Sequence, residues 1–146
     1  MRFMVIVKGD ERTEAGVMPT QDELSSTARY NEELVKAGVM LDGTGLQPTS
    51  KGAKVQFKGG KVVVVDGPFT ETKEIIAGYW IIQVKNKAEA IEWAKRIPFQ
   101  QIPGSDRVPE VEIRQLFEME DFGEGEGTDH HKRLESELKK QGAKAI

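Results

Sequence analysis

The sequence of 146 residues contains no cysteine and only two histidines, His130 and His131. The lack of cysteine excludes disulfides, thiolate metal sites and a cysteine nucleophile. The two histidines are adjacent, so on a helix their side chains would point about 100° apart instead of forming a two-ligand face. We therefore expect no metal site, and we interpret the histidines as surface residues.

The chain also lacks an excess of positive charge and a long apolar run. Its formal net charge is -3, which leaves no positive field to hold a polyanion. No apolar run approaches the roughly 18 residues of a membrane-spanning helix, and residues 1–10 are typical of a strand instead of a signal peptide. We expect a cytoplasmic protein whose partners include neither nucleic acid nor membrane.

A phosphate-binding glycine loop is missing as well. Gly43 and Gly45 flank Thr44, but the remaining glycine of a dinucleotide fingerprint is absent and no helix pattern follows. These glycines instead indicate a bulge or a close backbone approach in a short edge strand. The sequence accordingly predicts no cofactor.

Hydrophobic residues make up 38% of the chain and charged residues 31%, as is usual for one soluble globular domain. Apolar periodicity and turn residues divide this domain into strands and helices. The predicted elements are, in order, a strand at 2–8, a helix at 20–37, a short strand at 39–41, a hairpin at 54–65, a strand at 75–84, a helix at 86–97 and a strand at 111–117.

Local signals set the ends of these elements. Thr20 and Asn86 each stand three residues before a glutamate, which is the spacing of a helix N-cap. Gly38 is a suitable C-terminal stop for the first helix. Gly59 and Gly60 lie between two extended runs, and a Gly-Gly pair there predicts a tight two-residue hairpin.

The strands at 2–8 and 75–84 are apolar on both faces, so we place both in the centre of a sheet. With the hairpin inserted before the third core strand, the order of elements is the βαββαβ order of a ferredoxin-like α+β fold with an antiparallel sheet. Two helices cover only one face of such a sheet. We therefore expect a homodimer whose sheets pack face to face, with a ligand pocket between them.

Residues 123–146 differ in character from the predicted domain at 1–122. Gly123 to Gly127 form an acidic linker of alternating glycine and glutamate, and residues 129–141 are a highly charged helical candidate. Leu134 and Leu138 are its only well-spaced apolar pair. This tail therefore needs a docking surface if its helix is to be ordered.

The densest group of functional residue types is the run from Asp66 to Glu74, between two apolar strands. Gly67 permits unusual backbone conformations and Pro68 fixes φ, so the start of the run is first of all a turn. In a functional interpretation, Asp66 points its carboxylate into the intersheet pocket as a general base or polar anchor, and Phe69 is an apolar wall. Both interpretations stay open.

The run Asp66-Gly67-Pro68-Phe69, continued through Lys73 and Glu74, resembles the signature of the YCII-related family, in particular its DGPF branch. The resemblance covers about residues 1–122. It implies a small bacterial protein with a ferredoxin-like fold that forms a dimeric α/β barrel, and relatives of mostly unknown function. It also adds weight to a functional role for Asp66.

Members of the wider superfamily are thought to pair a histidine on the first helix with an aspartate. In this sequence the first helix has Arg29 and Tyr30 but no histidine, so the proton-transfer pair cannot be carried over. Arg29 is suited to anchor an anion, but it is a poor general base because it stays protonated. The sequence therefore leaves open whether the protein is an enzyme.

The predicted site consists of Asp66, as catalytic acid or base, and a set of ligand-binding residues. The ligand-binding candidates are Arg29, Tyr30, Gly67, Pro68, Phe69, Lys73, Glu74, Tyr79 and Arg114. Arg114 would need a carboxylate such as Asp66 or Glu74. Tyr79 and Trp80 alternate faces of their strand, so one of them should meet the helices and the other the pocket or dimer contact.

Two classes of function remain. The first is a cofactor-free protein that binds a small, partly polar ligand beside Asp66, with or without acid/base catalysis. The second is a regulatory module that uses the charged tail, because genes for DGPF-type proteins often stand beside genes for extracytoplasmic-function sigma factors, which makes such a factor a candidate partner. A cofactor-free monooxygenase of the dimeric α/β barrel type is a third hypothesis, supported by fold analogy alone.

Overall fold

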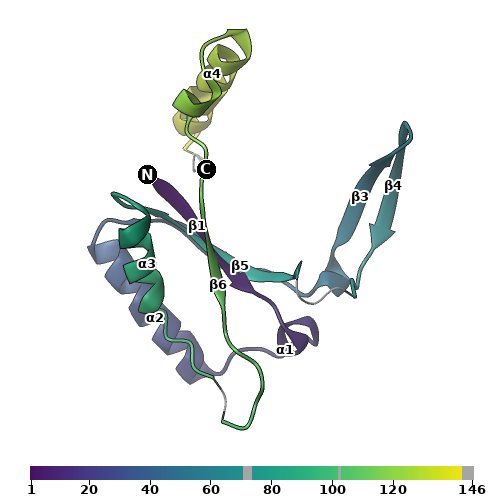
Figure 1. Ribbon diagram of the computed structural model, residues 1–146, viewed down its shortest axis with the longest axis vertical. Helices are drawn as coiled ribbons and strands as arrows, with labels where there is room; N and C mark the ends of the chain where they lie inside the picture. Colours follow the sequence, from purple (N-terminus) through teal and green to yellow (C-terminus); the bar gives the residue numbers. More distant parts are fainter. Residues whose placement is uncertain (71–73, 102, 143–146) are drawn as a thin grey trace. The chain divides into compact units, whose positions relative to one another are not determined.

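The computed structural model describes residues 1–70, 74–101 and 103–142. It divides into two compact units, Met1–Gln115 and the segment from Leu116 onward. The elements of the first unit are β1 (Arg2–Lys8), α1 (Glu11–Glu14), α2 (Gln21–Lys36), β2 (Met40–Gly45), the 3-10 turn η1 (Thr49–Lys51), β3 (Ala53–Lys58), β4 (Lys61–Asp66), β5 (Ile76–Gln83), α3 (Lys87–Lys95) and β6 (Val111–Gln115). Figure 1 shows the chain coloured along the sequence.

Four strands form an antiparallel sheet in the order β2-β5-β1-β6. The two strands that are apolar on both faces, β1 and β5, are therefore the central pair, as the sequence predicts. This order and the mixed α+β arrangement are compatible with a ferredoxin-like fold. The short strand β2 lies at an edge, and its register shifts between Met40 and Asp42, which confirms the expected irregularity near Gly43.

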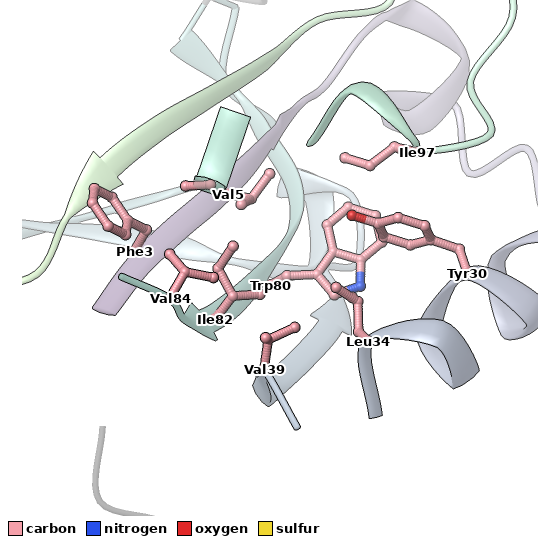
Figure 2. Close-up of a cluster of buried hydrophobic side chains, with 10 residues drawn as sticks. Phe3, Val5, Tyr30, Leu34, Val39, Trp80, Ile82, Val84 and Ile97 are labelled. Atoms are coloured by element: carbon pink, nitrogen blue, oxygen red, sulfur yellow. The ribbon is translucent and has the colours of Figure 1, made fainter. Parts of the chain in front are cut away.

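Helices α2 and α3 pack on the same face of this sheet and bury one apolar core (Figure 1). Figure 2 shows how Tyr30 and Leu34 of α2 approach Trp80 of β5. The rings of Tyr30 and Trp80 meet edge to face, with centroids 5.5 Å apart, a favoured aromatic geometry. Trp80 is thus the member of the Tyr79-Trp80 pair that meets the helices. Its indole Nε1 donates a hydrogen bond to Asn31 Oδ1 at 2.8 Å.

The opposite face of the sheet has two buried residues at its centre and less buried ones around them. Strand alternation puts Ile6 and Ile81 on this face, yet their side chains are only 8% and 1% exposed. Polar groups border them, since Glu112 accepts hydrogen bonds from Lys8 Nζ and Arg114 Nη1, both at 3.3 Å. The expected homodimer through this face stays a prediction.

The predicted caps are present. Thr20 accepts a hydrogen bond from the backbone N–H of Glu23, and Asn86 accepts one from Glu89. Gly38 has φ +72° directly after the first long helix, a conformation that favours glycine. A short helix that the sequence pattern did not reveal, α1, follows Asp10, whose side chain accepts from the backbone N–H groups of the first turn.

Strands β3 and β4 form a separate two-stranded ribbon (Figure 1). Gly59 and Gly60 make the predicted two-residue turn with φ +54° and +78°, both in the region that tight hairpin turns require. Every residue of β4 is exposed. This ribbon therefore differs from the four-stranded sheet, although its sequence is as apolar.

The second unit contains the 3-10 turn η3 (Met119–Phe122) and helix α4 (Glu126–Lys140). The rings of Phe117 and Phe122 contact each other with centroids 5.0 Å apart. The helix begins at Glu126, three residues before the predicted start at Asp129, so part of the expected linker is helical. Its pair Leu134 and Leu138 is exposed. Among the described residues, no helix is both long enough and apolar enough to cross a membrane.

Candidate ligand groove at the base of the hairpin

The turn after β4 lies directly against the backbone of η1. The N–H of Gly67 donates to the carbonyl of Gly52 at 2.9 Å, and the peptide bond from Gly67 to Pro68 is cis. A Cβ atom at position 67 would lie 1.7 Å from the carbonyl oxygen of Thr49. Glycine is therefore required here by close backbone approach, which explains this position of the motif in structural terms.

A hydrogen-bonded relay fixes the next part of the turn. The carboxylate of Glu14, at the end of α1, accepts from the backbone N–H of Thr49 at 3.0 Å and from its Oγ1 at 2.5 Å. Thr49 Oγ1 in turn accepts from the backbone N–H of Phe69 at 3.0 Å. Three segments far apart in sequence thus hold Phe69 in place.

Sequence reasoning missed Glu14 and Thr49. A signal for the local structure around Glu14 was present, because Asp10 and Thr13 have the spacing of a capping box and do form one. Arg107 also contacts the carboxylate of Asp10, so α1 is tied to the long segment before β6. No comparable local signal marks Thr49.

A groove of about 230 Å³ lies beside this turn. Its lining residues are Lys54, Gln56, Val65, Pro68, Phe69 and Thr70. Lys54 Nζ is 4.4 Å from the centroid of the Phe69 ring, within the range of a cation–π contact. The groove thus combines one positive charge, a polar amide and hydroxyl, and an aromatic wall.

Lys54 and Gln56 were not among the predicted site residues. They occupy alternate positions of β3 and therefore share a face of the ribbon with Val65, the register partner of Lys54. The pairing of β3 with β4 brings them to the motif. The sequence predicted this hairpin but did not indicate which of its faces meets Phe69.

Asp66 is exposed and is not a lining residue of the groove. It pairs with Ala53 in the ribbon, one position from the Lys54–Val65 pair, so its side chain starts from the opposite face. With the residues that the structure describes, its carboxylate makes no hydrogen bond or ion pair. A general base usually has buried surroundings and an orienting partner.

Of the other predicted residues, Pro68 and Phe69 line the groove, whereas Arg29, Tyr30, Tyr79 and Arg114 lie elsewhere in the first unit. Arg29 is exposed and donates to Ser26 Oγ at 3.3 Å. Tyr30 is buried under the sheet, where its hydroxyl donates to the carbonyl of Trp93 at 2.8 Å. Burial raises the pKa of Tyr30 to about 12, so its hydroxyl stays protonated at neutral pH.

Tyr79 is half-buried on the face of the sheet away from the helices. Arg114 contacts Glu112 and not Asp66 or Glu74, so the suggested pairing was wrong. Glu74 is exposed. Lys73 lies outside the described residues.

A metal centre is not evident in the part of the chain that the structure describes, since it holds no group of three or more histidine or acidic side chains close enough to bind an ion. Among the described residues that line the groove there is no carboxylate and no histidine. What it can do chemically is hold a small ligand through the ammonium of Lys54 and the ring of Phe69.

Comparison with known proteins agrees with the motif and the topology. The model of the YCII-related domain matches residues 1–119. The chain is also similar to the uncharacterized protein R00369 of Rhizobium meliloti (strain 1021), with 29% identity over 97 residues, which is 65% of this chain and 78% of that protein. The protein described by this sequence and structure is therefore a member of the YCII-related family.

Proposed function

We propose that the groove at the hairpin base binds a small, partly polar molecule that carries an anionic group. The observation that carries this proposal is the position of the Lys54 ammonium over the Phe69 ring, 4.4 Å from its centroid. Among the described residues Lys54 forms no ion pair, so its charge is available to a carboxylate or phosphate group. The ring offers an apolar wall beside that charge.

The relay beneath the groove supports the proposal. Because Thr49 Oγ1 accepts from the N–H of Phe69 and itself donates to Glu14, the backbone that carries the aromatic wall is held before a ligand arrives. A preformed site loses less conformational entropy on binding than a mobile one. The turn motif would then serve binding by setting the position of Phe69.

The volume of the groove limits the ligand. Pockets for drug-sized molecules usually measure about 300 to 1,000 Å³, and this groove measures about 230 Å³. The proposed ligand is therefore a small monoanion with a short apolar or aromatic part. We propose binding and not acid/base catalysis, because Asp66 is exposed and starts from the other face of the ribbon.

The test uses benzoate and inorganic phosphate as probes of the intact protein, followed through the amide NMR signals of Phe69 and Thr70. Lys54→Gln removes the charge. Lys58→Gln is the matched control, because Lys58 lies on the same face of β3 but does not line the groove. We expect benzoate to shift both signals in the wild type and the control, and to shift them at least 5-fold less in Lys54→Gln. Equal shifts in all three proteins would contradict the proposal.

A role of the tail in binding a protein partner such as a sigma factor stays a prediction from the family resemblance. The exposed pair Leu134 and Leu138 on α4 favours it, and deletion of residues 123–146 would test it by loss of partner capture.

A further inference from the structure

Helix α1 belongs to a series of contacts that begins far from the groove in the sequence. Its N-cap residue, Asp10, uses its two carboxylate oxygens for different partners. Oδ1 accepts from the backbone N–H groups of Arg12 and Thr13 at 2.7 and 2.9 Å, and Oδ2 contacts the guanidinium of Arg107. The first turn of α1 is therefore joined to a residue 97 positions from its cap.

The segment before β6 sets the position of Arg107. Ser105 Oγ accepts from the backbone N–H of Arg107 at 3.1 Å, and the carbonyl of Ser105 accepts from the side-chain amide of Gln101 at 3.1 Å. The side chains of Asp10 and Arg107 are 18% and 40% exposed, so solvent screens their attraction only in part. Arg107 does not line the groove itself. Any influence that it has on the groove must therefore pass through other residues.

Helix α1 depends on its cap. It has four residues, far fewer than the roughly 12 to 15 that an isolated helix needs in water. Its backbone closes on the cap, since the N–H of Glu14 donates to the carbonyl of Asp10 at 3.0 Å. The N–H of Gly9 anchors the cap on the sheet side by donating to the carbonyl of Ile75 at 2.7 Å. The position of Glu14 therefore follows from that of Asp10.

The contacts beyond Glu14 fix the direction of one hydroxyl group. Thr49 Oγ1 has one hydrogen, and the contact with Glu14 Oε2 at 2.5 Å uses it, because a carboxylate only accepts. A lone pair of Thr49 Oγ1 is then left for the N–H of Phe69, which donates to it at 3.0 Å. Glu14 thus makes Thr49 face Phe69 as an acceptor.

We propose that Arg107 is a positioning residue for the groove, which acts on the Phe69 wall through helix α1 and the Thr49 hydroxyl. We call the contacts from Arg107 to Phe69 the positioning chain. Hydrogen-bonded networks and short rigid elements of this kind can couple distant parts of a protein. The inference rests on the proposed function, because the position of the wall matters to a ligand only if one binds there. The segment before β6 then controls the groove without touching its ligand.

Amide hydrogen exchange of the intact protein tests the positioning chain without any ligand. Arg107→Gln removes the charge that contacts Asp10. Arg12→Gln is the matched control, because it removes the same charge from an exposed residue of α1. We expect the N–H of Phe69 to exchange at least 3-fold faster in Arg107→Gln and at the wild-type rate in Arg12→Gln. Equal rates in both variants would overturn the proposal.

A double-mutant cycle separates the positioning chain from a general loosening of the fold. Thr49→Val removes the hydroxyl that joins α1 to Phe69 and keeps the shape of the side chain. If the effect of Arg107 passes through Thr49, adding Arg107→Gln to Thr49→Val should leave the Phe69 exchange rate unchanged. A further acceleration of 3-fold or more would show that Arg107 acts by another route and would overturn the proposal.

Benzoate binding to the same proteins distinguishes this inference from the proposed function. We expect the dissociation constant to rise at least 3-fold in Arg107→Gln and to stay unchanged in Arg12→Gln. If the wild type and Arg107→Gln bind benzoate equally well, the positioning role is overturned and the proposed function stands. If the wild type does not bind benzoate, the proposed function is wrong, whereas faster Phe69 exchange in Arg107→Gln alone still supports the positioning chain.

Discussion

Strands β5 and β4 are similar in sequence character and opposite in environment. β5 runs through Tyr79, Trp80, Ile81 and Ile82, and its central residues are buried or half-buried. β4 contains four consecutive valines, and every residue in it is exposed. β5 is paired on both sides and covered by two helices, whereas among the described residues β4 pairs with β3 alone.

The difference shows that apolar content alone does not decide where a strand is buried. Neighbouring elements decide it, and for β4 the described residues of its own chain do not provide them. An exposed apolar surface is costly in water. On this ribbon that surface is the face of Val55, Phe57, Val62 and Val64, whereas the other face carries the lysines and Gln56.

Truncation of one buried and one exposed side chain should separate the two strands most clearly. Ile82→Ala removes a side chain that is 1% exposed, and we expect it to lower the free energy of unfolding by about 3 kcal/mol. Val64→Ala, measured at concentrations low enough for a monomer, should cost less than about 0.5 kcal/mol. Urea unfolding measures both, and equal losses would show that the ribbon packs within its own chain.

The second prediction concerns the junction between the ribbon and the first unit. Gly67→Ala places a methyl group against the Thr49 carbonyl, 1.7 Å away without movement, so the turn must shift at a cost of about 2 kcal/mol. Gly52→Ala is the control, because its Cβ would meet the same atom at an ordinary 3.6 Å. Amide hydrogen exchange should be faster at Phe69 in Gly67→Ala alone. Unchanged protection there would refute the close approach.

The smallest effect is expected at a buried polar group of the main core. Tyr30→Phe removes the hydrogen bond from the Tyr30 hydroxyl to Trp93, and this should lower the free energy of unfolding by about 1 kcal/mol. Tyr79→Phe, on the opposite face of the sheet, should have less effect.

The same residue predicts a pH dependence. Burial raises the pKa of the Tyr30 hydroxyl from 10.0 to about 12, so between these values the unfolded chain loses a proton that the folded chain keeps. The contribution of Tyr30 to stability is therefore complete below pH 10 and is lost as pH rises toward 12. Between pH 10 and 12, the midpoint temperature of thermal unfolding should fall less steeply with pH in Tyr30→Phe than in the wild type. Identical slopes would argue against burial of the hydroxyl.

Local signals explain what could be predicted from the sequence. Caps at Thr20 and Asn86, the Gly59-Gly60 turn and the two-faced apolar strands depend on residues a few positions apart, and together they implied the strand order. The relay from Glu14 through Thr49 to Phe69 joins residues 35 and 20 positions apart, and α1 is only four residues long. Neither the relay nor this short helix produces a hydrophobic periodicity that can be detected in the sequence.

The candidate site was predicted only in part. The motif did mark the place of the groove, and Pro68 and Phe69 line it. Its cation, Lys54, comes from the strand paired with β4, and a sequence pattern does not reveal which cross-strand neighbour faces an aromatic ring. Burial of Ile6 and Ile81 was likewise unforeseen, because it depends on side chains from several strands.

The most direct test of the contrast between β4 and β5 is the solvent exposure of their methyl groups, read from NMR signals in the presence of a soluble paramagnetic agent. We predict that the methyl signals of the four β4 valines, Val62 to Val65, are strongly relaxed, whereas those of Ile81 and Ile82 in β5 are protected. Protection of the β4 valines equal to that of Ile81 and Ile82 would contradict the exposure of the ribbon.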